Sequence, residues 1–175
     1  MLLTTSESRW DYLRRLSEVA DEVLVSSYNI YTGMSKNGNL VKSSNTLNSR
    51  RFMDNVNREN TRILIGVPPS VFCRENCLDC QENRDGLVSR FSHHQRKWDK
   101  SQFGFARGLH LKLYLFRKGD KWKGFTGGAN LSASQWEDLL IQIPDEGLNE
   151  AKDFFERLWA EKREPIEVLK NWSFD

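Results

Sequence analysis

The sequence predicts a single layered α/β domain built on a mixed β-sheet, and three observations lead to this class. Short apolar runs typical of strands mostly alternate along the chain with amphipathic stretches of helical period. The chain has 175 residues, which is long enough for one domain with its own core and short for two. Neither an internal repeat nor a low-complexity tract divides it. We therefore expect residues 1–175 to form one domain, with an insert at about residues 70–100.

The first part of the chain is expected to open with an amphipathic helix. Trp10, Leu13 and Leu16 fall on one side of a helix over 6–20, and Ser6 is suited to cap its start. In chain order, the elements expected before the insert are a helix (6–20), a strand (23–31), a loop rich in glycine, asparagine and serine (33–49), a helix (50–59) and a buried strand stopped by two prolines (62–67).

After the insert we expect two strands joined by a turn, then a further strand and a final amphipathic helix. Lys118, Gly119 and Asp120 supply the turn, and Pro144 ends the last strand. In chain order, these elements are two strands (109–116 and 121–126), the start of a short helix (132–135), a strand (138–143) and a helix (148–162). The inner stripe of the final helix is formed by Leu148, Ala151, Phe154, Phe155, Leu158 and Trp159.

The residues that carry chemistry fall on and just after the first two of these strands. His110 and Lys112 are two apart, so on a strand their side chains point to the same face. Gly127 and Gly128 let the backbone come close to a bound group, and Asn130 adds a neutral hydrogen-bond donor. A nucleophile, a cation, a glycine pair and a carboxamide are the parts needed to hold and attack a phosphate ester.

These residues resemble the signature of the phospholipase D superfamily, H-x-K followed by G-[GS]-x-N. The resemblance is sharp over 109–145 and elsewhere follows only the order of the elements. It implies a sheet sandwiched between helices, with the active residues at strand ends. It also implies that His110 attacks phosphorus to form a phosphohistidine, while Lys112 and Asn130 neutralise and orient the non-bridging oxygens. No metal is required in such a scheme.

Some positions extend the resemblance and others depart from it. The family usually has an aspartate where Arg117 stands, and often a serine where Gly128 stands. We expect Arg117, Gly127 and Gly128 to contact the substrate. The carboxylate that fixes the tautomer of the nucleophile matches Glu137 best, with Asp138 as a near competitor; either residue is otherwise an ordinary exposed acid at the start of a strand.

The chain carries one copy of the motif, because His93 and His94 are followed by Gln95 and Arg96. Since relatives with one long chain carry two copies, the resemblance implies that two chains must meet. We expect a homodimer with both motifs facing each other across a two-fold axis. The partner's His110 would protonate the leaving oxygen and then act as the base on water.

The insert contains all three cysteines of the chain. Cys73, Cys77 and Cys80 lie within eight residues, and His93 and His94 follow shortly after. Thiolates with this spacing converge on a tetrahedral Zn²⁺, with one of the two histidines as fourth ligand. The alternative is three free thiols in a flexible loop. We expect a closed, structural zinc site that gives this polar segment a fold.

Charge is informative through its distribution, because the net charge is only +2. Basic residues gather around the motif and acidic ones toward the C-terminus, which would suit a phosphate-rich polymer, although a solvated surface explains many such runs. The basic residues in question are Arg90, Arg96, Lys97, Lys100, Arg107, Lys112, Arg117, Lys118, Lys121 and Lys123.

The sequence thus predicts a metal-independent phosphodiesterase, foremost a nuclease that acts on DNA rather than RNA. No run reaches the roughly 18 apolar residues that span a bilayer, and the N-terminus lacks the features of a signal peptide, so we expect a cytoplasmic protein. Two alternatives remain open. One is a lipid phosphodiesterase, and the other is a module on the same scaffold that binds nucleic acid or phosphate with little or no catalysis.

Overall fold

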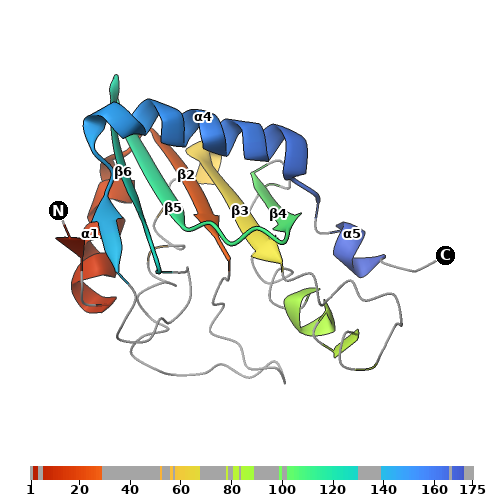
Figure 1. The fold of residues 1–175 in the computed structure, drawn as a ribbon. Helices are drawn as coiled ribbons and strands as arrows, with labels where there is room; N and C mark the ends of the chain where they lie inside the picture. Colours follow the sequence, from red (N-terminus) through yellow and green to blue (C-terminus); the bar gives the residue numbers. More distant parts are fainter. Residues whose placement is uncertain are drawn as a thin grey trace.

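The computed structural model describes residues 2–3, 6–28, 52, 56, 58–67, 78, 81–82, 84–88, 99, 102–129, 139–165 and 167–171. The named elements within these residues are seven strands, three α-helices and one 3₁₀ turn. Figure 1 labels the helices and the strands β2 to β6. In chain order they are β1 (Leu2–Leu3), α1 (Ser6–Val19), β2 (Glu22–Ser27), η1 (Arg58–Asn60), β3 (Thr61–Val67), β4 (Phe103–Arg107), β5 (Leu113–Lys118), β6 (Lys121–Gly127), β7 (Leu140–Gln142), α4 (Asp145–Lys162) and α5 (Glu167–Lys170).

The strands form one mixed sheet in the order β1-β7-β6-β5-β2-β3-β4. The three strands β2, β3 and β4 are parallel, whereas β5 runs antiparallel to β2. The hairpin of β5 and β6 continues the antiparallel part, followed by β7 and β1. The mixed α/β class predicted from the sequence is therefore confirmed.

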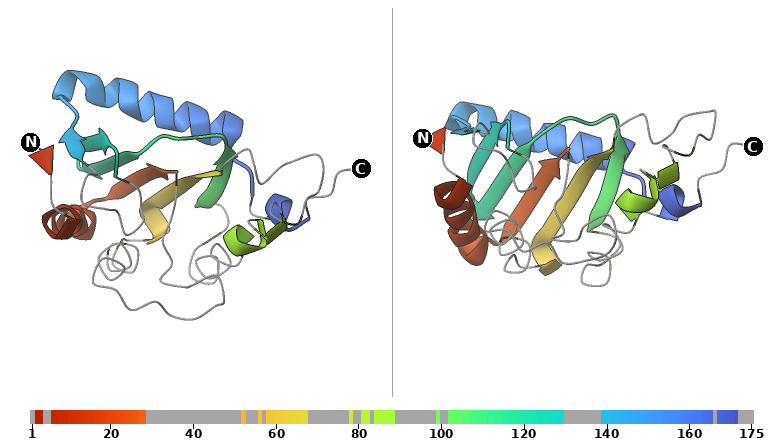
Figure 2. Two further views of the ribbon diagram at one scale, coloured as in Figure 1. Left: turned by 60° about the horizontal axis from the view of Figure 1, so that its bottom comes forward. Right: turned by 90° about the horizontal axis from the view of Figure 1, so that it is seen from below.

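Helices pack on both faces of the sheet, as Figure 2 shows for α1 and α4. Side chains alternate along each strand. In β2, Val23 and Val25 face a core that includes Trp10 and Leu13 of α1. Leu24, between them, faces a second core formed with α4. The helix α1 therefore covers one face of the sheet, and α4 covers the other.

Most of the predicted elements that fall on described residues are present. The predicted strand at 109–116 is wrong at its start, because the ladder with β2 begins only at Leu113. Phe154 was expected in the inner stripe of α4 but is 39% exposed. The strands β1 and β4 and the helix α5 were not predicted. The loop predicted at 33–49 and the short helix predicted at 132–135 lie outside the described residues, as does most of the helix predicted at 50–59.

Within the described part of the chain, no helix is both long enough and apolar enough to cross a membrane.

Candidate active site at the carboxyl ends of the parallel strands

The segment that carries His110 crosses the end of the sheet. The strand β4 lies beside β3, whereas β5 lies on the far side of β2, so the connection between them must pass β3 and β2 (Figure 1). Three strand spacings of ~4.8 Å amount to about 14 Å, which residues 108–112 span only when they are nearly extended. The connection therefore lies against the carboxyl ends of β2 and β3, the edge where ligands bind in many α/β sheets.

Three contacts hold this crossing segment against the sheet. Gly108 turns the chain with a φ of 67°, and its N–H donates to the carbonyl of Val67 at 2.8 Å. The Ser26 hydroxyl reaches the carbonyl of Leu111 at 3.4 Å. A Cβ built on Gly66 would lie 1.8 Å from the carbonyl oxygen of Leu109, so the close approach at this point requires glycine.

The side chains of His110 and Lys112 contact each other at this end of the sheet. The Nζ of Lys112 lies 2.8 Å from Nδ1 of His110 and 3.2 Å from its Nε2. It also donates to the His110 carbonyl at 3.2 Å. The two side chains thus come together as the sequence predicts, although they stand on the crossing segment and not on a strand.

Tyr28, directly after β2, completes the cluster. Its ring centroid is 4.3 Å from that of His110, with the planes tilted by 51°. The Nζ of Lys112 lies 5.5 Å from the same ring centroid, within the range of a cation–π contact. One aromatic ring therefore contacts both the imidazole and the ammonium group.

The two polar residues of the motif differ in their exposure to solvent. His110 is exposed, whereas Lys112 is only 6% exposed. Lysine is almost never buried without polar partners, because its ammonium group loses its hydration. A buried cation behind an exposed imidazole is an arrangement that can bind an anion and present a nucleophile to it.

The hairpin of β5 and β6 ends beside the cluster. The Thr126 hydroxyl donates to the carbonyl of Lys112 at 2.9 Å, and the Tyr114 hydroxyl donates to the carbonyl of Ala129 at 2.8 Å. Gly127 has a φ of 152°, and a Cβ on it would lie 2.1 Å from the Leu139 carbonyl oxygen. The next N–H, of Gly128, donates to that oxygen at 2.9 Å. The described contacts of the glycine pair are therefore with the protein itself, and their contact with a substrate stays a prediction.

The structure does not bring Arg117 to this cluster. Five residues of extended chain separate it from Lys112, a distance of about 17 Å along β5. Its guanidinium donates to Glu22 at 3.0 Å and to the carbonyl of Gly119 at 3.1 Å. Arg117, which we expect from the sequence to contact the substrate, therefore lies at the end of the sheet opposite to His110 and Lys112.

Around Arg117 lies an ion-pair network that ties α4 to the sheet. Arg62 donates to Glu22 at 2.9 Å and to Glu156 of α4 at 2.5 and 2.6 Å. Its guanidinium also lies 5.8 and 5.7 Å from the ring centroids of Phe155 and Trp159. The hydrogen bonds that Arg62 donates to Glu156 are the main reason that the pKa of Arg62 is raised above its usual value. This end of the molecule is therefore fixed by charge pairs.

Several predicted site residues lie outside the described residues. They are Asn130, Glu137, Asp138 and the predicted zinc ligands Cys73, Cys77, Cys80, His93 and His94. Among the residues that the structure describes, no group of three or more histidine, cysteine, aspartate or glutamate side chains is placed to hold a metal ion. The zinc site therefore stays a prediction.

Sequence reasoning missed Tyr28 and Gly66. Tyr28 ends an apolar strand, where an aromatic residue is common for packing alone. Gly66 interrupts the run Thr61–Val67, and a glycine inside a strand often marks a close backbone approach. The glycine was thus a usable signal, whereas nothing local to Tyr28 pointed to His110.

Comparisons with known proteins add little to this geometry. No family model matches the chain, and no curated protein matches it. Among solved structures, one of TrmBL2, described as an archaeal chromatin protein with a novel mode of DNA binding, is similar with a TM-score of 0.43 and 11% sequence identity. The match covers 93% of this chain and 52% of the TrmBL2 chain, so this chain spans about half the length of TrmBL2.

Proposed function

We propose that the protein is a phosphodiesterase of phospholipase D type that cleaves nucleic acid through a phosphohistidine on His110. The observation that supports this most is the exposed imidazole in contact with the buried ammonium group of Lys112, at the carboxyl ends of three parallel strands. A sheet covered by helices on both faces fits the same proposal. We propose DNA rather than RNA as its substrate.

The reaction has two displacements at phosphorus. In the first, a ring nitrogen of His110 forms a bond to phosphorus while the bond to the leaving oxygen breaks, and the partner's His110 donates its proton to that oxygen. In the second, a water oxygen bonds to phosphorus and the phosphorus–nitrogen bond breaks. The partner's His110 takes the proton of that water. Lys112 offsets the charge on the non-bridging oxygens.

The contact between Lys112 and His110 sets the order of events. An ammonium group can only donate, and both ring nitrogens lie within reach of Nζ, so the nitrogen that carries the lone pair is the acceptor. That lone pair is not free to attack phosphorus while the contact lasts. An arriving phosphate offers stronger acceptor oxygens, which draw the Lys112 ammonium away and release the imidazole. Binding of the anion thus activates the nucleophile.

The test of this chemistry is to trap the intermediate. Wild-type protein is quenched during turnover of an oligonucleotide, and its peptides are analysed by mass spectrometry at neutral to basic pH. The expected result is a phosphoryl adduct on the peptide that contains His110, absent from Lys112→Gln and His110→Ala. An adduct on another residue, or cleavage without any adduct in single-turnover conditions, would contradict the proposal.

The dimer is tested by mixing subunits. If each active site needs His110 from both chains, random mixing of equal amounts of wild-type and His110→Ala chains leaves about one quarter of the activity, because that is the share of wild-type dimers. Independent active sites would leave about one half. The mixture is made by unfolding and refolding together, with each chain refolded alone as the control.

A structural zinc ion in the insert belongs to the same proposal and rests on cysteine spacing alone. Metal analysis of the purified protein should find one zinc per chain, lost together with folding of the insert in Cys77→Ser. Protein without zinc and a normally folded Cys77→Ser would exclude the site.

A further inference from the structure

The largest group of basic side chains in the described hairpin lies at the end of the sheet opposite to His110. Lys118 and Lys121 flank the turn between β5 and β6, and Lys123 follows on β6. Six residues of extended chain separate Lys118 from Lys112, about 20 Å along β5. These lysines are close to the motif in the sequence, but the direction of the strands carries them away from it in the structure.

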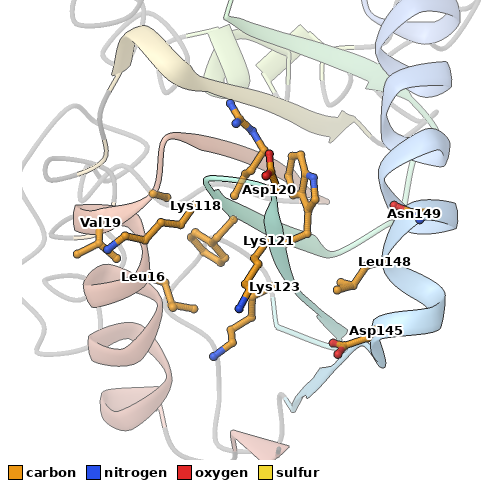
Figure 3. Close-up of a pocket in the computed structure, with 13 residues that line it drawn as sticks. Leu16, Val19, Lys118, Asp120, Lys121, Lys123, Asp145, Leu148 and Asn149 are labelled. Carbon is orange, nitrogen blue, oxygen red and sulfur yellow. The ribbon is translucent and has the colours of Figure 1, made fainter.

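These lysines border a cavity of about 570 Å³ (Figure 3). Figure 3 shows Val19 of α1 on one side of the hairpin and Leu148 of α4 on the other, with the three lysines between them. Trp122 and Phe116 add apolar wall from the hairpin itself. A volume of several hundred Å³ with apolar walls and a few polar groups is typical of ligand sites.

The charge of the cavity is unbalanced. Arg117 and the three lysines line it together with two carboxylates, those of Asp120 and Asp145. No ion pair within the described part of the chain involves Lys118, Lys121 or either carboxylate. The Nζ of Lys123 is fixed by the Tyr12 hydroxyl at 3.1 Å, with the Tyr12 ring centroid at 5.7 Å. An anionic ligand would thus meet one cation held in place and two more that have no charged partner among the described residues.

The cavity lies beside a strand edge that is open in the described structure. The strand β7 pairs with Phe125, Thr126 and Gly127, and Ile143 donates to the Gly124 carbonyl at 2.8 Å. Beyond that point, no described strand covers Lys121 or Trp122 on this side. Lysines on a bare edge also discourage edge-to-edge pairing of sheets. Preventing edge pairing does not require a cavity with apolar walls beside the lysines. The lysines and the cavity together are the features of a binding groove.

We infer that this cavity, bordered by Lys118, Lys121, Lys123 and Trp122, binds an unpaired nucleotide of a single-stranded nucleic acid, with its phosphates on the lysines. This inference rests on the proposed nuclease function. Basic grooves with aromatic side chains bind single strands because unpaired bases can stack in them, whereas the bases of a duplex are already stacked and cannot enter a recess. The roughly 20 Å between Lys118 and Lys112, which contacts His110, corresponds to roughly six nucleotides of stacked strand. The substrate is therefore a single strand, or a duplex with a single-stranded extension, that contacts both ends of the sheet.

The test measures binding, so it does not depend on catalysis. In the His110→Ala background, the affinity for a fluorescent 15-nucleotide single strand is measured by anisotropy at several salt concentrations. Adding Lys118→Gln and Lys121→Gln should make the slope of log affinity against log salt shallower by about 1.4, because each phosphate contact on a single strand contributes about 0.7. The matched control, Lys152→Gln with Lys162→Gln on α4, should leave the slope unchanged.

Three results would overturn the inference. The first is an equal slope in the two double variants. The second is a mononucleotide that binds as tightly as the 15-mer, which would make the cavity a site for a small anion. The third is equal binding of polyglutamate, which would indicate an acidic protein partner. If wild-type protein cleaves nothing while the slope changes as expected, the nuclease proposal fails and the binding site stands.

Discussion

A single added methyl group at Gly66 should displace the crossing segment, residues 108–112, which carries His110. The Cβ of alanine at this position would lie 1.8 Å from the carbonyl oxygen of Leu109, 2.9 Å from its carbonyl carbon and 3.2 Å from the Cα of Tyr28. All three atoms are backbone, so no side chain can rotate away. The crossing segment must move by roughly 1.5 Å to reach ordinary contact distance. Because Leu109 precedes His110, the proposed nucleophile moves with it.

The displacement has consequences for both activity and stability. A shift of about 1 Å in a reacting group can cost on the order of 100-fold in rate, and overpacking of this kind costs about 1–3 kcal/mol of unfolding free energy. We therefore expect Gly66→Ala to lose roughly 100-fold in kcat/KM on an oligonucleotide, measured at a temperature where urea titration shows the variant fully folded.

Gly119→Asn is the matched control for Gly66→Ala. Gly119 has a φ of +57°, a conformation that asparagine tolerates, and a Cβ there meets no atom within 4 Å. This variant should keep full activity and lose at most about 0.5 kcal/mol of unfolding free energy. If Gly66→Ala were as active and as stable as Gly119→Asn, the crossing segment would not be positioned by contact with β3.

Three further predictions test other parts of the structure. Tyr28→Leu should lower kcat/KM about tenfold, because about 1.4 kcal/mol of ring contact with the imidazole and the ammonium group is lost. Tyr28→Phe keeps the ring and should stay within about threefold of the wild-type value. Equal losses in the two variants would mean that the hydroxyl matters and not the ring. Arg62→Met should lower the free energy of unfolding in urea by about 1–3 kcal/mol, because it breaks a half-buried ion pair with two glutamates. As a control, Arg15→Met should cost less than about 0.5 kcal/mol, because the Arg15 side chain is 69% exposed. Hydrogen bonds from Arg14 and then Arg15 hold the pKa of Asp11 below its ordinary value of 3.8, so its contribution to stability is present above that value and disappears as the pH falls through the lowered pKa. Asp11→Asn should therefore be less stable than wild type at pH 6, and the difference should shrink as the pH falls through the lowered pKa. A difference that stays the same into acid would contradict this.

The elements with a clear local pattern could be predicted from the sequence. The helix α1 and the strand β3 follow from helical and strand-like runs of apolar residues that long-range contacts only reinforce. The strand β4 was missed because its five residues gain their partner from β3, far back in the chain, and not from any local signal. The same dependence on distant strands explains why the strand predicted at 109–116 is wrong in the segment before Leu113. Its composition suits a ladder, but it is used to cross the sheet.

The contact between His110 and Lys112 could be predicted from the sequence, whereas the layout around them could not. The meeting of His110 with Lys112 follows from a spacing of two in extended chain, which holds on the crossing segment as it does on a strand. The position of Arg117 does not follow from nearness in sequence. A strand carries residues five apart to opposite ends of a sheet. Tyr28 reaches His110 only because β2 and the crossing segment end at the same edge.

Cleavage in the presence of EDTA tests the central claim most directly. Purified wild-type protein, His110→Ala and Lys112→Gln are incubated with single-stranded and plasmid DNA after brief chelation. Because the lysine ammonium and the two imidazoles supply the charge and the proton transfers, the proposal predicts that wild-type protein cleaves in EDTA and that both variants lose at least about 1,000-fold in rate. Cleavage that continues at the wild-type rate in His110→Ala would contradict it.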